Sequence, residues 1–183
     1  AELAAQKVDA IKIWVDDNLG KVPKLKPAMY RAVIDEAHKA NVRVFSHVFA
    51  LADAKDLVKS GLDGVAHSIR DREVDDEFIN LMKEKDIVYI PTLMAYGAPF
   101  IYASSPDWQA ERAMFSTYAP QLLDDLGSEK FVNAFKNDPN LPLLRAQYNV
   151  ALKNLKRLSE AGVRIGFGTD SGAGGEGHRA DPA

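Results

Sequence analysis

The sequence contains no cysteine, so disulfide bonds and thiolate metal ligands are excluded and the redox compartment is left open. It also lacks an apolar run close to the ~20 residues that a membrane-spanning helix requires. Acidic residues slightly outnumber basic ones, which gives a formal net charge of -3 and no excess of basic residues for contacts with phosphates. We therefore expect neither a nucleic acid nor a membrane among the partners.

The rest of the composition is that of a folded globular domain. The chain has 183 residues, of which 46% are hydrophobic and 27% are charged, and this length is enough to bury a sizeable core. It begins at Ala1 without Met or a charged-then-apolar leader, and it stops just after a glycine-rich stretch. We therefore expect a piece of a longer chain, with the cytoplasm as the favoured compartment and a removed signal peptide as the alternative.

A regular alternation of helical and strand-like segments runs along the chain. Helical patterns cover residues 27–40, 51–60, 73–85 and 150–162, and each leads into a short run rich in β-branched residues that ends at or near a polar residue. With the run at residues 8–17 this gives five predicted strands. Such an alternation is typical of βα units with a parallel sheet, so we predict an α/β fold.

Polar side chains lie inside or at the ends of these apolar runs, namely Lys12, His47, His67, Thr92 and Asp170. The carboxyl ends of parallel strands form the active face of α/β folds, so side chains from different strands are expected to meet there. A single histidine at such a position is more often a core residue with satisfied hydrogen bonds. Two histidines, a lysine and an aspartate on four different strands favour a functional site.

The combination of histidine, carboxylate and lysine narrows the chemistry. Neutral imidazoles and carboxylates are the usual ligands of Zn²⁺ and similar ions. Period-two alternation places Lys12 on the face opposite Ile11 and Ile13, the interior of a closed barrel, where burial disfavours the charged form of a lysine. A neutral amine can attack CO₂ to give a carbamate ligand, or a substrate carbonyl to give a Schiff base. The two histidines favour the carbamate.

Five segments in this order resemble the metal-dependent amidohydrolase superfamily, and within it the imidazolonepropionase-like and Xaa-Pro-dipeptidase-like branch; they are IKIWVDD, SHVF, VAHSIRD, IPTL and AGVRIGFGTDSG. The resemblance implies a (β/α)₈ TIM barrel of the metal-dependent hydrolase type, incomplete here, with about strands 4 to 8 and their helices. By that resemblance, residues 1–183 form part of an amidohydrolase catalytic barrel.

The same resemblance implies roles for four residues. Lys12 matches a carboxylated lysine that bridges two metals, and His47 and His67 match the ligands of the second metal. Asp170 matches an acid that ligates metal and carries the proton from the attacking water to the leaving nitrogen. Zinc is the expected ion, as one or two divalent cations. This sequence has no HxH pair of the kind the family's first strand carries, so we expect this chain alone to hold at most one metal, through Lys12, His47 and His67.

The stretch at about 95–149 interrupts the alternation and is predicted to be a helical insertion. Helix starts are indicated at Ser105-Pro106, at Ser128-Glu129 and at Pro142. Loops that leave the carboxyl ends of parallel strands often carry function, so this insertion is a candidate lid or substrate wall as well as a packed ornament. Tyr96, just beyond the Thr92 strand, is a candidate substrate contact.

These observations favour a hydrolase that uses a metal-activated water to cleave an amide-type C–N bond in a small molecule, either a cyclic amide or a dipeptide-like substrate. Two alternatives stay open. Lys12 could form a Schiff base in a lyase or aldolase. The chain could also be a catalytically inactive half-barrel that self-associates as a homo-oligomer, because an open sheet exposes unpaired edges.

Overall fold

The structure is a computed structural model of the chain, and it describes residues 2–104 and 124–170. The chain divides into two compact units. The first comprises Ala1–Pro91 and Val150–Gly168, and the second comprises Thr92–Asn149 and Thr169–Ala183. Each unit is described by itself below.

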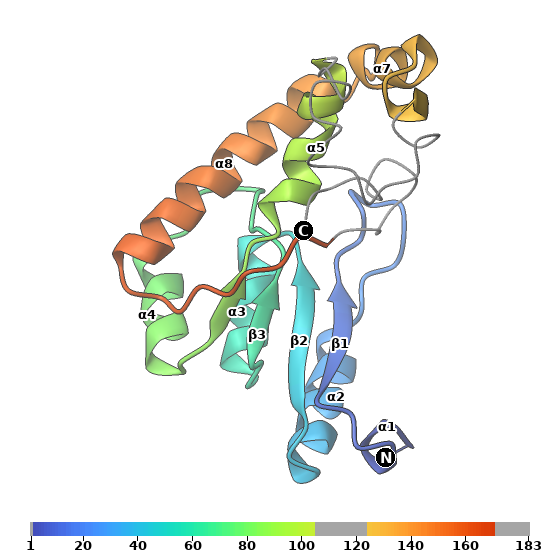
Figure 1. Cartoon of the computed structure of the whole chain (residues 1–183). Coiled ribbons are helices and arrows are strands. Elements are labelled where there is room, and N and C mark those ends of the chain that lie inside the picture. Colours follow the sequence, from blue (N-terminus) through green and yellow to red (C-terminus); the bar gives the residue numbers. More distant parts are fainter. Residues whose placement is uncertain (1, 105–123, 171–183) are drawn as a thin grey trace. The chain divides into compact units, whose positions relative to one another are not determined.

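The first unit is a parallel sheet with helices between successive strands (Figure 1). Its sheet has the strand order β1-β2-β3-β4, and every pair is parallel. The elements, in chain order, are α1 (Glu2–Ala5), β1 (Ala10–Val15), α2 (Pro27–Lys39), β2 (Arg43–Val48), α3 (Leu51–Lys59), β3 (Gly64–Ala66), α4 (Asp76–Glu84) and β4 (Val88–Ile90). The prediction of a parallel α/β fold is confirmed.

The helices begin and end where local chemistry favours it. α2 starts with Pro27, whose fixed φ suits the first helical position and whose missing N–H would have no intrahelical partner there. α4 is capped by the Asp75 side chain, which accepts a hydrogen bond from the Phe78 amide. A left-handed glycine, Gly61 at φ 98, follows α3. These signals explain why the predicted ranges of α2, α3 and α4 agree with the structure to within a few residues, whereas the helix predicted at residues 150–162 begins earlier, at Leu141.

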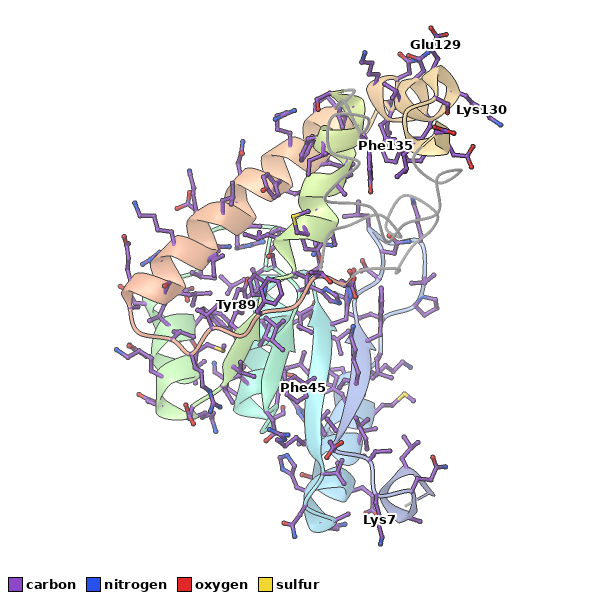
Figure 2. All side chains as sticks on the ribbon, viewed as in Figure 1. Lys7, Phe45, Tyr89, Glu129, Lys130 and Phe135 are labelled. Atoms are coloured by element: carbon purple, nitrogen blue, oxygen red, sulfur yellow. The ribbon has the colours of Figure 1, made fainter. Side chains whose placement is uncertain are left out.

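The pairing register separates the two faces of the sheet. The face toward the core holds Val15, Val44, Val48, Val65 and Tyr89, all of which are buried with the apolar sides of the helices. Parallel-paired residues share a face, so the opposite face, called the site face here, carries Lys12, Trp14, Phe45, His47, Gly64, Ala66, Val88 and Ile90. Figure 2 labels Phe45 on β2 and Tyr89 on β4, which belong to opposite faces.

The fifth predicted strand is reduced to a single bridge in the described residues. Ile165 pairs in parallel with Tyr89, through hydrogen bonds from the Tyr89 amide to the Arg164 carbonyl and from the Gly166 amide to the Tyr89 carbonyl. The next rung toward the carboxyl end of β4 would need an amide proton at Pro91, which proline lacks. The expectation of five full strands is therefore wrong by this one element.

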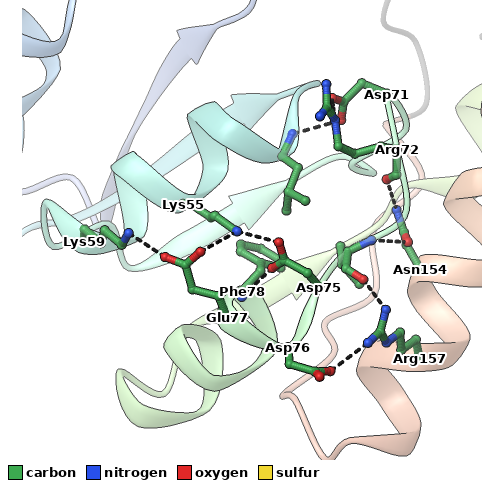
Figure 3. Close-up of polar contacts among 12 residues, drawn as sticks. Lys55, Lys59, Asp71, Arg72, Asp75, Asp76, Glu77, Phe78, Asn154 and Arg157 are labelled. Carbon is green, nitrogen blue, oxygen red and sulfur yellow. Dashed lines mark hydrogen bonds and ion pairs between the residues drawn. The ribbon is translucent and has the colours of Figure 1, made fainter.

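The loop after β3 is fastened to the helix α8 (Leu141–Glu160) through a buried amide (Figure 3). The Asn154 side chain accepts from the Val74 amide at 2.8 Å and donates to the carbonyls of Ile69 and Arg72, each at 2.9 Å. Arg157, one turn along α8, donates to the Val74 carbonyl and pairs with Asp76 at 2.7 Å. The segment that follows the third strand is thereby held in one conformation.

The second unit contains α5 (Leu93–Ala103), α7 (Glu129–Lys136) and the first part of α8. That residues 95–149 form an insertion in a barrel stays a prediction. Ser128 caps α7 by accepting from the Phe131 amide, and Pro142 lies in the first turn of α8, so both predicted starts are confirmed. The predicted start at Ser105-Pro106 lies outside the described residues. α5 was not predicted, because Gly97 and Pro99 lie inside it.

Aromatic rings form the core of this second unit. Tyr102 of α5 is buried, and its ring lies 5.2 Å from the rings of both Phe131 and Phe135 on α7, measured between centroids. Figure 2 labels Phe135 on α7 near Glu129 and Lys130.

No helix in the described part of the chain is long and apolar enough to cross a lipid bilayer.

Candidate metal-binding site

Three of the polar strand-end residues meet on the site face. Lys12 lies on β1, His47 on β2, and His67 directly after β3. The Lys12 Nζ and His67 Nε2 atoms are 3.1 Å apart, and the rings of His47 and His67 are 4.4 Å apart between centroids. The parallel register contributes to this, because it pairs Trp14 with His47 and so places Lys12, two residues before Trp14, on the same face of the sheet as His47.

Within the described part of the chain, one ring nitrogen of His47 is paired and the other has no hydrogen-bond partner. Its Nε2 lies 2.8 Å from Oδ2 of Asp16, and both side chains are buried, with 7% and 8% of their surfaces exposed. Its Nδ1 is also buried and has no hydrogen-bond partner among the described residues. A buried polar atom without a partner is costly, so such an atom suggests a ligand that is not part of the chain.

Asp16 was not among the predicted site residues, although the sequence contains a signal for it. Lys12, Trp14 and Asp16 alternate along the first apolar run, so a strand through this run places all three on one face. Asp16 and Asp17 also look like an ordinary polar end of the strand, which hides this signal. In the structure Asp16 is 7% exposed and faces His47.

Trp14 covers one side of the histidine. The Trp14 and His47 residues are register partners, and their rings stack at 3.5 Å between centroids with an interplanar angle of 13°. The indole itself is 53% exposed, since β1 is an edge of the sheet in the described residues. Trp14 therefore forms an outer wall of the site.

The electrostatics favour neutral imidazoles beside an ionised carboxylate. Burial lowers the pKa of His67 to about 3, and the nearby cationic groups, Lys12 among them, act in the same direction. Burial also lowers the pKa of His47, although the hydrogen bond to Asp16 offsets part of this effect. Burial alone would raise the pKa of Asp16, but the hydrogen bonds from His47 and from the Asn18 amide hold it below its usual value.

The backbone of His67 adopts an uncommon conformation. Its φ is 73°, in the left-handed region that side-chain-bearing residues seldom occupy, while its amide donates to the Ile90 carbonyl at 2.8 Å. Neighbouring contacts hold this segment, since Ser68 Oγ donates to the Pro91 carbonyl at 2.7 Å. Such a conformation costs about 1–3 kcal/mol and is found most often at functional sites.

Lys12 differs from the sequence-based expectation in its exposure. The alternation of residues predicts a buried interior position for this lysine, whereas the structure places it on an exposed position of the edge strand. The site face is open at β1 in the described residues, so the cost of burying an ammonium group does not arise there. Lys12 nevertheless reaches His67, as the 3.1 Å contact requires.

The remaining predicted site residues belong to the second unit. Asp170 has a left-handed backbone with φ 60°, and Thr92, with φ 44°, precedes α5. Tyr96 lies on α5. The grouping of Asp170 and Tyr96 with Lys12, His47 and His67 stays a prediction.

Lys12, His47 and His67 carry donor atoms that suit a divalent cation. Two neutral imidazoles provide lone pairs, and the buried Nδ1 of His47 has nothing else to bind among the described residues. In the described ranges, no group of three histidine, aspartate or glutamate side chains is arranged to hold a metal ion without a further ligand. The third ligand, which would carry a negative charge, would therefore have to come from Lys12 as a carbamate or from another part of the protein.

Comparison with known proteins places the fold among amidohydrolase and prolidase-like structures. No family model matches the chain. An uncharacterized protein of Mycobacterium tuberculosis is 32% identical over 82 residues, which are 44% of this chain and 21% of that protein, and a Mycobacterium bovis protein matches to the same extent. The matched segment thus spans about a fifth of the length of these curated relatives.

Solved structures match over most of the chain. The ochratoxinase of A. niger has a TM-score of 0.62 at 21% identity and covers 93% of this chain and 33% of its own. A putative prolidase from Bifidobacterium longum has a TM-score of 0.61 at 22% identity, with 93% and 38% covered. A Xaa-Pro dipeptidase with bound methionine in its active site has a TM-score of 0.58 at 22% identity, with 94% and 37% covered. The chain therefore shares a fold with about a third of each of these larger proteins.

Proposed function

We propose that Lys12, His47 and His67 hold one divalent cation in a hydrolase that cleaves an amide-type C–N bond of a small molecule. The observation that carries the proposal is the convergence of Lys12, His47 and His67, with a buried Nδ1 of His47 that has no partner in the described residues. The shared fold with proteins described as prolidase, ochratoxinase and amidohydrolase supports this reaction class.

Zinc is the ion that best suits these ligands. His47 Nδ1 and His67 Nε2 would donate their lone pairs, and Lys12 would add an anionic oxygen ligand once its amine has combined with CO₂ to form a carbamate and released a proton to solvent. The cation would supply Lewis acidity, polarising the scissile carbonyl and making water a better nucleophile near neutral pH. The residues around it keep the imidazoles neutral and oriented.

The chain's own residues have further proposed roles. Asp170 would take a proton from the attacking water and return it to the leaving nitrogen, as its match in the resemblance implies. Tyr96 would contact the substrate. The substrate class is a cyclic amide or a dipeptide-like molecule. In keeping with this, two similar solved structures are a Xaa-Pro dipeptidase with bound methionine and a prolidase complexed with N-methylphosphonate-L-proline.

The two histidines beside Lys12 favour the carbamate over the Schiff-base alternative. Both reactions start from the free amine of Lys12 and release a proton, so proton transfer does not distinguish them. Lys12 is in contact with His67, whose pKa is lowered to about 3. The same low pKa suits a metal ligand, because the lone pair stays available over the whole neutral range.

Hydrolysis assays on the purified, zinc-loaded chain test this proposal. We would measure amine release from Xaa-Pro dipeptides, N-acyl amino acids and cyclic amides, with and without a chelator. Lys12→Ala, His47→Ala and His67→Ala are each expected to lower the rate by more than ~100-fold, above the range for outer-sphere groups. Lys153→Ala, an exposed change on α8, serves as control.

Hydrolysis that persists with chelator, or that is equal in the parent and the three site variants, would contradict the proposal. A chain that neither hydrolyses these substrates nor binds zinc, and that forms a stable oligomer, would support the half-barrel alternative instead. Trapping of a carbonyl substrate on Lys12 by borohydride would support the lyase alternative.

A further inference from the structure

We infer that Asp16 is a positioning residue that holds His47 with its proton on Nε2, so that the lone pair of Nδ1 is the atom presented to a ligand. The use of that lone pair for a metal rests on the proposed function. The orientation of the imidazole does not, because it follows from contacts within the first unit.

The Asp16 carboxylate is fixed at both oxygens. Its Oδ1 accepts from the Asn18 amide at 2.9 Å, and its Oδ2 lies 2.8 Å from His47 Nε2. An ionised carboxylate has no proton to donate, so the proton of this hydrogen bond belongs to the imidazole. Nε2 is therefore the N–H of the neutral ring, and Nδ1 carries the lone pair.

The ring has little freedom to turn away from this arrangement. Trp14 stacks on one side of it, and His67 lies 4.4 Å away between ring centroids. Both His47 and Asp16 are buried, at 6% and 7% exposure, so water does not compete freely for the hydrogen bond. An imidazole tied to a carboxylate through one nitrogen and left with a buried, unpartnered second nitrogen is the arrangement that metal-binding histidines adopt.

A purely structural role for Asp16 makes a different prediction. If the carboxylate only stabilised the loop after β1, its removal would lower the free energy of unfolding without changing the ring proton or the affinity for a metal. A positioning role changes both, even in a variant that stays folded. Asp16→Asn suits this test because the amide keeps the size of the carboxylate, can still accept from the Asn18 amide, and can offer either a donor or an acceptor to His47.

The first measurement is the imidazole ¹H–¹⁵N spectrum of the metal-free chain, with thermal unfolding to confirm that each variant is folded. We expect a downfield, slowly exchanging proton coupled to Nε2 of His47 in the parent, and a shifted, faster-exchanging signal in Asp16→Asn. Asp17→Asn is the matched control. It removes the same charge at the neighbouring residue, whose side chain is 39% exposed. The inference is overturned if the parent carries the proton on Nδ1, or if Asp16→Asn leaves the signal unchanged.

The second measurement is zinc affinity by calorimetry on the same three proteins. We expect Asp16→Asn to weaken zinc binding by about 10–100-fold, and Asp17→Asn to change it by much less. Equal weakening in both variants would mean that only charge matters, and it would overturn the positioning role. A parent that binds no zinc would count against the proposed function, while the spectrum would still decide whether Asp16 sets the tautomer.

Discussion

The buried Asn154 network should contribute a large share of the stability of the first unit (Figure 3). We consider Asn154→Leu, which keeps the approximate size of a side chain that is 1% exposed but removes its hydrogen-bonding atoms. Two of its three hydrogen bonds, to the Val74 amide and the Ile69 carbonyl, are fully buried. Each buried group left without a partner costs about 1–3 kcal/mol, so the expected loss is about 2–6 kcal/mol.

The assay is urea unfolding followed by far-ultraviolet circular dichroism, with Lys153→Ala as the matched control. Lys153 precedes Asn154 on α8 and pairs with Glu73 of the same loop at 2.8 Å, but these side chains are 67% and 57% exposed. Such an exposed ion pair contributes little, so Lys153→Ala should leave the free energy of unfolding nearly unchanged. A loss below about 1 kcal/mol for Asn154→Leu, or one equal to that of Lys153→Ala, would contradict this prediction.

Two further predictions concern the sheet and its histidines. A Cβ added at Gly64 would overlap the Phe45 ring, so Gly64→Ala should lower the free energy of unfolding by about 1–3 kcal/mol. The same change in a Phe45→Ala background should cost clearly less. Additive effects of the two changes in a double-mutant cycle would contradict this prediction. The pKa of His67 is about 3 in the folded chain and 6.5 ordinarily. Between pH 3 and pH 6.5 the unfolded chain therefore binds more protons at His67 than the folded chain does. The metal-free chain should consequently lose stability as the pH falls below 6.5. The free energy of unfolding should fall by at most about 1.4 kcal/mol per pH unit. If it falls as steeply with pH in His67→Gln as in the parent, the assignment to His67 is contradicted.

Sequence periodicity was enough to predict α2, α3, α4 and the parallel sheet. The apolar spacing and the terminal signals around α2, α3 and α4 are local, and tertiary packing did not override them. Position at a strand end also predicted that Lys12, His47 and His67 would lie close together, and their contacts agree with this. Their role as metal ligands stays a prediction.

The features that sequence reasoning missed depend on contacts between distant segments. Asp16 looks like an ordinary polar strand end until His47, 31 residues later, is placed beside it. Asn154 looks like a solvent-facing helix residue, and only the loop at Ile69 to Val74 explains its burial. The shortened fifth strand follows from Pro91, whose missing amide proton matters only once β4 has a neighbour on that side.

The zinc content of the purified chain after zinc loading and desalting, determined by plasma mass spectrometry, would show directly whether Lys12, His47 and His67 bind a metal. The parent and Lys153→Ala should retain stoichiometric zinc, and the combined Lys12→Ala, His47→Ala, His67→Ala variant, shown to be folded by circular dichroism, should retain none. A parent without zinc, or a triple variant that retains as much zinc as the parent, would contradict the assignment of these three residues to a metal site.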